Sequence, residues 1–333
     1  MSSQPFYHLR PNKYLDRQNF LSTLSKLEET LSFDNYVYVG FGSYLFDDFK
    51  LMHNRFNIKK MISLECDLKV AERAEFNKPF KCIEIIKESS TEYINSFSHD
   101  EKSNYIFWLD YTAPSELRMQ FADFVTFIRN MEHGDILRIT LNATPSSLGE
   151  ERGLAGEELR DKRLKTLKDR IEDYLPIDVD IDMLTTERYP RLLLKALKKA
   201  MHEALYETQF QSLFPVPIAS AVYQDGMQML TFTLIVLDDH KQEEKIISKL
   251  FPVFCDNPNY LKKIEAIIWE DPQIIAIPDL TTKEILEVNS MLPEENAELE
   301  LSEKFSFVFN GPKNAKDYLK YYKNYPYFRE VNF

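Results

Sequence analysis

Two of the eight glycines in this 333-residue chain, Gly40 and Gly42, are separated by a single residue. They follow a short β-rich run, Tyr36–Val39, and precede apolar residues at helical spacing. Glycine at a strand-to-helix junction permits positive φ and close approach of the backbone to a ligand, and the helix N-terminus offers free N–H groups. The pair therefore indicates a ligand-binding turn, with an ordinary tight turn as the alternative.

An acidic residue stands at the spacing that such a turn requires for binding a nucleoside. Glu65 ends a second apolar run, Met61–Leu64, roughly 20 residues after Gly42, where an acid binds ribose hydroxyls in adenosine-binding sheets. A dinucleotide site needs a third small residue, but Leu45 occupies that position, which argues against NAD or FAD. S-adenosylmethionine carries no pyrophosphate, so for this ligand the two glycines suffice.

Alternating strand and helix patterns would position these residues. The predicted strands that alternate with helices are Tyr36–Val39, Met61–Leu64, Cys82–Ile86, Tyr105–Leu109 and Ile136–Leu141. Short runs that are apolar on both faces indicate a parallel sheet covered by helices on both sides. An Asp225-Gly226 pair between two later β-rich runs predicts a hairpin whose two turn residues both have positive φ. We therefore expect an α/β, Rossmann-like, mostly parallel seven-stranded sheet that ends in an antiparallel hairpin.

Changes in these patterns predict the domain organisation. Residues 1–34 contain a helical pattern and are predicted to form an N-terminal helical cap. The Rossmann-like domain is predicted over 35–240, with a helical insertion at 146–215 that contains two charged amphipathic stretches. Residues 241–333 are predicted to form an α-rich C-terminal extension.

Over about residues 35–240, the chain resembles the class I S-adenosylmethionine-dependent methyltransferases, and within them a bacterial group labelled O-methyltransferases. The shared motifs are VGFGS (39–43), ISLE (62–65), ERAEFNKPF (72–80) and WLDY (108–111). The resemblance implies S-adenosylmethionine as cofactor and the following site residues. The methionine and ribose portion of the cofactor would be lined by Gly40, Gly42 and Ser43, and Glu65 would bind the ribose hydroxyls. The adenine would be bordered by Glu88 and Ser89. The methyl group and the acceptor would be faced by Asp110 and Tyr111.

Two residues depart from the family pattern, and they keep a second function open. Tyr38 stands where an acid is usual, and Ser43 stands where a third glycine is common. Methyl transfer also needs an aligned nucleophile and often a base, for which Asp110 is a candidate, with a helix-capping role as its alternative. The first hypothesis is a methyltransferase of unknown acceptor. The second is a non-catalytic or regulatory module that binds an adenosyl ligand or a protein or nucleic-acid partner.

Composition limits the remaining classes. A net charge of −12 argues against non-specific nucleic-acid binding over the whole surface, but two basic stretches, 188–199 and 316–329, could contact a nucleic acid or protein. The alternative for both is a solvated helix face and an aromatic tail packed on the core. The six histidines are scattered, so no metal site is predicted. Neither a membrane span nor an export signal is expected, and three cysteines without a CxxC pair suggest the cytoplasm.

Overall fold

The computed structural model describes residues 10–100, 102–151, 153–206, 212–254 and 259–326. Its contacts divide the chain into two compact units. The larger one, here called the sheet unit, comprises residues 23–222 and 227–273. The smaller one, here called the C-terminal unit, comprises residues 223–226 and 274–333 together with the first 22 residues. The domain boundaries expected from sequence, at 34/35 and 240/241, stay a prediction.

The sheet has the order β3-β2-β1-β4-β5-β7-β6-β8. Its strands are β1 (Tyr36–Gly40), β2 (Lys60–Leu64), β3 (Ile83–Ile86), β4 (Asn104–Asp110), β5 (Ile136–Asn142), β6 (Phe214–Asp225), β7 (Met227–Leu237) and β8 (Gln273–Ile275). Pairing is parallel from β3 to β5, and β7 is antiparallel to β5. The Rossmann-like prediction is therefore confirmed, but in the described part of the chain the sheet has eight strands rather than seven. The eighth strand has only three residues, fewer than any run that sequence periodicity could identify.

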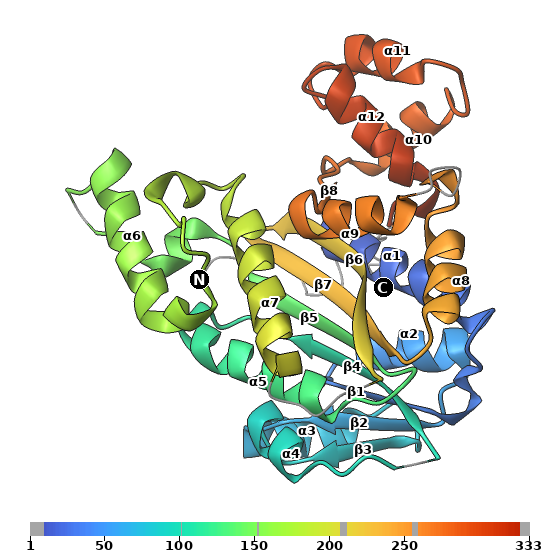
Figure 1. Cartoon of the computed structure of the whole chain (residues 1–333). Coiled ribbons are helices and arrows are strands. Elements are labelled where there is room, and N and C mark those ends of the chain that lie inside the picture. The colour runs from blue at the N-terminus through green and yellow to red at the C-terminus, as the bar shows by residue number, and fades with distance from the viewer. Residues whose placement is uncertain (1–9, 101, 152, 207–211, 255–258, 327–333) are drawn as a thin grey trace. The chain divides into compact units, whose positions relative to one another are not determined.

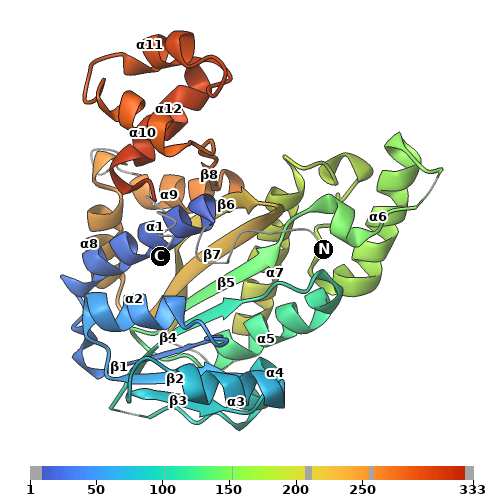
Figure 2. The same ribbon diagram turned by 180° about the vertical axis from the view of Figure 1, so that it is seen from behind.

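Helices cover both faces of the sheet (Figures 1 and 2). Those of the sheet unit are α2 (Asp47–Phe56), α3 (Leu68–Asn77), α4 (Ser90–Ser96), α5 (Leu117–Asn130), α6 (Gly156–Ile171), α7 (Tyr189–Tyr206), α8 (His240–Leu250) and α9 (Tyr260–Glu270). Helix α1 (Pro11–Glu28) belongs to the C-terminal unit up to residue 22 and to the sheet unit from residue 23. On one face, the ring of Phe49 in α2 packs edge-on against Tyr38 of β1, with centroids 4.8 Å apart. On the other face, Phe127 of α5 packs against Phe107 of β4 at 4.9 Å. Apolar strand residues on both faces are thus buried under helices, as the sequence pattern predicts.

Helices α6 and α7 form the predicted insertion between β5 and β6. In α7, apolar residues at helical spacing are buried, among them Leu193, Leu197 and Ala200, each 0% exposed. Helix α7 packs mainly on α5, which lies over the same face of the sheet (Figure 1). The insertion therefore extends the helical layer on that face.

The C-terminal unit contains α10 (Thr282–Asn289), α11 (Ala297–Lys304) and α12 (Pro312–Tyr321). Within this unit, the carboxylate of Asp225 accepts hydrogen bonds from the backbone N–H groups of Asn12 (3.1 Å) and Lys13 (2.7 Å), in the first turn of α1. Asp225 therefore caps a helix as well as ending a strand. The positive φ expected at both residues of the predicted turn occurs only at Gly226, where φ is +98°. The turn is tighter than the two-residue loop that the sequence predicts, because β6 continues through Asp225.

Candidate functional site

The glycine loop, residues 40–46, links β1 to α2 and has no room for side chains at its two glycines. A Cβ atom on Gly42 would lie 2.7 Å from the ring of Phe46 and from Oγ of Ser63. One on Gly40 would lie 2.9 Å from the hydroxyl of Tyr38. The positive φ values instead occur at Ser43 (+49°) and Phe46 (+54°). Close packing, rather than the positive φ expected from sequence, therefore requires glycine here.

Glu65 is bound to this loop. The backbone N–H of Ser43 donates to Oε1 of Glu65, and Oγ of Ser63 lies 3.5 Å from the same oxygen. Ser63 also accepts a hydrogen bond of 3.0 Å from the N–H of Gly42. The structure thus brings together three of the residues that the sequence selects, Gly42, Ser43 and Glu65. Ser63, which connects them, was not predicted, although a serine inside an apolar strand was the available signal.

Burial has the largest effect on the ionisation of Glu65. Desolvation raises its pKa above the ordinary value of 4.5 and outweighs the hydrogen bonds from Ser43 and Ser63, which lower it. The nearby charge of Asp67 adds a smaller upward effect. Glu65 is therefore a half-buried carboxylate whose charged form is incompletely stabilised by the protein alone.

The segment that follows β3 begins a helix. Ser89 is the N-cap of α4: its hydroxyl accepts from the N–H of Glu92 at 3.2 Å, and its N–H donates to Oε2 of Glu92 at 2.8 Å. The side chain of Ser89 therefore takes part in a capping box with Glu92. Glu88, the residue before Ser89, is half-buried. These two residues lie at the carboxyl end of the strand that neighbours β2.

The segment that follows β4 places Asp110 and Tyr111 in different surroundings. Asp110 is the last residue of β4 and is half-buried. Tyr111 is only 6% exposed, and its hydroxyl donates to Oδ2 of Asp123 at 2.6 Å. Burial, followed by the charge of Asp123, raises the pKa of Tyr111 well above its ordinary value of 10. The phenol therefore stays protonated at neutral pH.

Strand order places the four segments at one edge of the sheet. The strands that precede them, β3, β2, β1 and β4, are neighbours in that order and run parallel. Gly40 is in register with Ser63 on one side and with Trp108 on the other. The ring of Phe41 lies 5.4 Å from that of Tyr111, between centroids. The carboxyl edge of this half of the sheet therefore carries all the predicted site residues.

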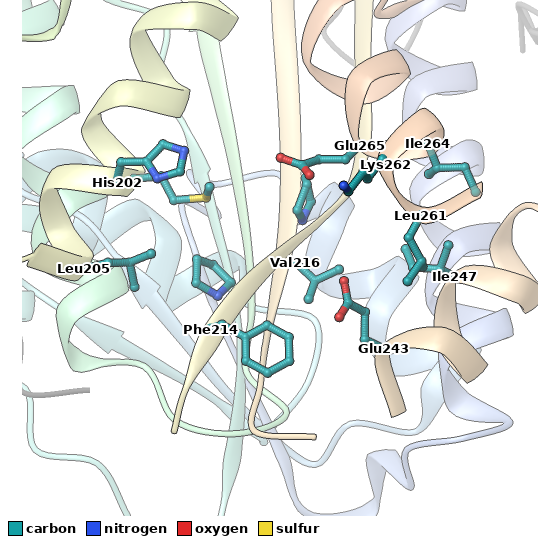
Figure 3. Close-up of a pocket in the computed structure, with 13 residues that line it drawn as sticks. His202, Leu205, Phe214, Val216, Glu243, Ile247, Leu261, Lys262, Ile264 and Glu265 are labelled. Atoms are coloured by element: carbon teal, nitrogen blue, oxygen red, sulfur yellow. The ribbon is translucent and has the colours of Figure 1, made fainter. Parts of the chain in front are cut away.

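A separate cavity of about 300 Å³ opens between α7, α8, α9 and the beginning of β6 (Figure 3). Its apolar wall includes Val216, Ile247 and Ile264, and carboxylates of Glu243 and Glu265 lie at its sides. The N–H of Gly134, two residues before β5, donates to the carbonyl of Val236 near the end of β7, so β7 ends at the amino-terminal edge of the sheet. Strand β6 precedes β7 in a hairpin and lies beside it, so the start of β6 lies at this same edge. The cavity is thus at the opposite edge from the glycine loop.

The two basic stretches are largely engaged within their own units. On α7, Arg191 binds Asp271 at 3.1 Å, and Lys198 lies 3.4 Å from Glu265. In the C-terminal stretch, Tyr318 is 0% exposed, and the hydroxyl of Tyr325 donates to the carbonyl of Pro278 at 3.0 Å. Residues 327–329 of that stretch lie outside the described residues. These contacts fit the structural alternative for both stretches.

Between residues 10 and 326, gaps excepted, no three or more His, Cys, Asp or Glu side chains are grouped as a metal site would require. Over the same part of the chain, every helix is too short or too polar to traverse a lipid bilayer.

Comparison with protein families identifies the chain. A family model described as "Putative O-methyltransferase" matches residues 5–333, so the chain belongs to this family of O-methyltransferases. This match confirms the methyltransferase resemblance seen in the sequence and the prediction of an enzyme. The comparison with curated proteins gives no match.

The solved structures that are similar to this chain share little sequence identity with it. Cofactor-bound Rv0187 from MTB is 13% identical over 71% of this chain and 85% of its own, with a TM-score of 0.38. TomG from Streptomyces achromogenes, an O-methyltransferase in complex with SAM, is 10% identical over 66% of this chain and 79% of its own, with a TM-score of 0.36. An O-methyltransferase from Bacillus cereus in complex with SAH is 8% identical over 70% of this chain and 85% of its own, with a TM-score of 0.38.

Proposed function

We propose that this O-methyltransferase uses S-adenosylmethionine as methyl donor and binds it at the carboxyl edge of β3, β2, β1 and β4. The observation that carries the proposal is the hydrogen-bonded unit of Gly42, Ser43, Ser63 and Glu65. It joins a loop that has no room for side chains at its two glycines to an acid at the spacing typical of ribose recognition. This combination fits an adenosyl ligand better than an ordinary tight turn.

The residues have separate roles in this proposal. The backbone at Gly40, Gly42 and Ser43 lies beside the methionine and ribose portion of the cofactor. A side chain at either glycine would clash with neighbouring protein atoms and displace this backbone. Among the described residues, both donors to Glu65 reach the same oxygen, Oε1, so Oε2 can accept from ribose hydroxyls. Glu88 and Ser89 border the adenine. Ser89 does so through its backbone, since its side chain caps α4.

Methyl transfer then depends on alignment and on removal of a proton. S-adenosylmethionine supplies an electrophilic methyl group carried on a positively charged sulfur. The chain must hold an acceptor hydroxyl in line with the methyl–sulfur bond and accept the proton that the hydroxyl loses. Asp110, at the end of β4, is the candidate for orienting the cofactor or taking that proton.

Calorimetry tests the cofactor assignment. Purified protein is titrated with S-adenosylmethionine, its demethylated product and NADH. We expect binding of both sulfur compounds, none of NADH, and a loss of at least about tenfold in affinity for Glu65→Ala, because two ribose hydrogen bonds to a carboxylate disappear. Glu72→Ala, at an exposed acid on α3, is the matched control and should bind normally. The absence of binding by the unaltered protein at high micromolar ligand would refute the cofactor.

The methyl acceptor has a separate test. The protein is incubated with S-adenosylmethionine carrying a labelled methyl group and with fractionated RNA, protein and small metabolites. Label transferred to one fraction identifies the acceptor class, and loss of that transfer in Asp110→Asn supports its role. Cofactor binding without transfer to any fraction would favour a regulatory module.

A partner surface and a location complete the proposal. The exposed cations of the 188–199 stretch, where a protein or nucleic-acid substrate would make contact, are Arg188, Lys195 and Lys199. A cytoplasmic location is supported by Cys66 and Cys82, which are free thiols as expected in a reducing compartment.

A further inference from the structure

A buried cluster of three hydroxyl groups surrounds Asp123 on α5. Tyr111 donates to Oδ2 of Asp123 at 2.6 Å, Ser90 donates to the same oxygen at 2.5 Å, and Thr91 donates to Oδ1 at 2.7 Å. Tyr111 also lies 3.0 Å from Oγ of Ser90. Asp123 is 1% exposed and Ser90 is 5% exposed. This group, here called the hydroxyl cluster, is a closed network inside the sheet unit.

The hydroxyl cluster connects two segments that follow different strands. Ser90 comes directly after Ser89, at the carboxyl side of β3, and Tyr111 comes directly after Asp110, at the end of β4. The ring of Tyr111 also contacts Phe41, which lies between the two glycines of the loop after β1. One tyrosine therefore joins both segments proposed to border the adenine and methyl ends of the cofactor, and touches the glycine loop.

The hydrogen bonds to the buried carboxylate of Asp123 hold the two segments firmly in place. A carboxylate that is almost fully buried is costly unless hydrogen bonds satisfy it, and hydrogen bonds to a charged acceptor are about twice as strong as neutral ones. Loss of any one donor leaves part of the buried charge unsatisfied, so the segments that carry the donors are held at fixed separations. Tyr111 must be protonated to donate, which excludes it as the base that removes a proton from the acceptor.

We propose that Asp123 and Tyr111 are positioning residues that set the width of the adenine site, by fixing the segment at 88–91 relative to the segment at 110–111. The proposal rests on the proposed cofactor site and deepens it. It replaces the catalytic role expected for Tyr111 from sequence. It also explains why an acid stands at position 123 between aromatic residues on the buried side of α5.

Ligand titrations of three variants test the proposal. Tyr111→Phe keeps the ring against Phe41 and removes only the hydroxyl. Asp123→Asn keeps the shape and removes the charge. We expect each to weaken S-adenosylmethionine binding about tenfold, and Ser90→Ala about threefold. Adenosine, which lacks the methionine portion, should lose affinity by the same factors. The double variant Tyr111→Phe/Asp123→Asn should be no weaker than the worse single variant, because both changes disrupt one network.

A matched control separates positioning from general stability. Tyr36 is another buried tyrosine of the sheet unit, 4% exposed, whose hydroxyl donates to the carbonyl of Gly134 at 2.7 Å. Tyr36→Phe removes a similar hydrogen bond far from the carboxyl edge, so it should lower thermal stability without changing cofactor affinity. If Asp123→Asn does not fold, Tyr111→Phe and Ser90→Ala carry the test.

The outcomes distinguish the two proposals. Failure of the unaltered protein to bind S-adenosylmethionine would refute the cofactor site itself. Normal binding by the unaltered protein and by both Tyr111→Phe and Asp123→Asn would overturn the positioning role while leaving the cofactor site intact. A Tyr111→Phe protein that binds normally but no longer transfers the methyl group would restore Tyr111 as a catalytic residue.

Discussion

Both edges of the sheet bury carboxylates, but the protein satisfies them to different degrees. At the amino-terminal edge, Asp135 is 0% exposed, and both of its carboxylate oxygens accept hydrogen bonds. Its Oδ1 accepts from the N–H of Tyr105 (2.8 Å) and from the side-chain amide of Asn104. Its Oδ2 accepts from the ring of His99 (2.9 Å) and from the N–H of Glu132 (2.9 Å). At the carboxyl edge, Glu65 is half-buried, and its described donors reach one oxygen.

The difference distinguishes a structural acid from a binding acid. Four donors from the chain itself leave Asp135 no capacity for a ligand, so its contribution is to stability. Glu65 has a raised pKa because burial is only partly offset, and such incomplete compensation is typical of functional sites. Substitutions at the two edges should therefore separate stability from binding.

The largest effect is expected from Asp135→Ala at the amino-terminal edge. Removing this carboxylate leaves buried donors without an acceptor and breaks the pair with His99, whose side chain is 10% exposed. We expect a loss of about 3–5 kcal/mol in the free energy of unfolding. Chemical denaturation measures it, and calorimetry on the protein that remains folded should give normal cofactor affinity. Weakened cofactor binding in the folded fraction would contradict the separation of the two edges.

The next effect is expected from Gly42→Leu at the carboxyl edge. Already the first carbon of the side chain would clash with Phe46 and Ser63, so the loop would have to shift and its hydrogen bonds to Ser63 and Glu65 would be disturbed. We expect a loss of about 1–3 kcal/mol in stability and of at least about 100-fold in cofactor affinity. Leu64→Ala, which removes bulk from the neighbouring strand, provides a comparison that destabilises the fold without introducing a clash in the glycine loop. Unchanged affinity in Gly42→Leu would move the cofactor site elsewhere.

A smaller and opposite effect on stability is expected from Glu65→Gln. Because the folded-state pKa of Glu65 lies above its ordinary 4.5, the folded protein binds the proton more tightly than the unfolded chain does. Stability from this group therefore falls as pH rises through the interval from 4.5 to the raised pKa, and stays lower above it. Glu65→Gln should lack this fall and have a higher melting temperature than the unaltered protein at neutral pH, while binding the cofactor more weakly. Thermal unfolding at several pH values measures the effect, and a lower melting temperature at neutral pH would contradict it.

The carboxyl edge also shows what sequence can and cannot predict. Short runs that are apolar on both faces and a glycine turn were sufficient to locate β1, β2 and Glu65, because these signals are local. They did not predict that Ser43 and Phe46, rather than the glycines, take positive φ, since that depends on packing against Ser63 from another strand.

The hydroxyl cluster is a second feature that the sequence did not predict. In the sequence, Asp123 is an ordinary polar residue of an amphipathic helix, and nothing nearby indicates a partner. Its role comes from Ser90 and Thr91, which lie on another helix, and from Tyr111 at the end of a strand. Periodicity predicts which elements form, but which polar groups meet inside is decided only when the elements pack.

The smallest effect on stability is expected from the titration of His99 at the amino-terminal edge. Burial alone would lower the pKa of His99, but the hydrogen bond and charge of Asp135, together with Glu132, outweigh it and raise the pKa above the ordinary 6.5. A group whose folded pKa is raised contributes stability that is complete below pH 6.5 and is lost as pH rises through the folded value. The free energy of unfolding should therefore decline above pH 6.5, and His99→Asn should be less stable below that pH and show a flatter profile. Cofactor affinity should show no dependence on His99 over the same range, because this histidine lies at the edge where the acids are already satisfied. A parallel decline in affinity, abolished by His99→Asn, would mean that the two edges are coupled.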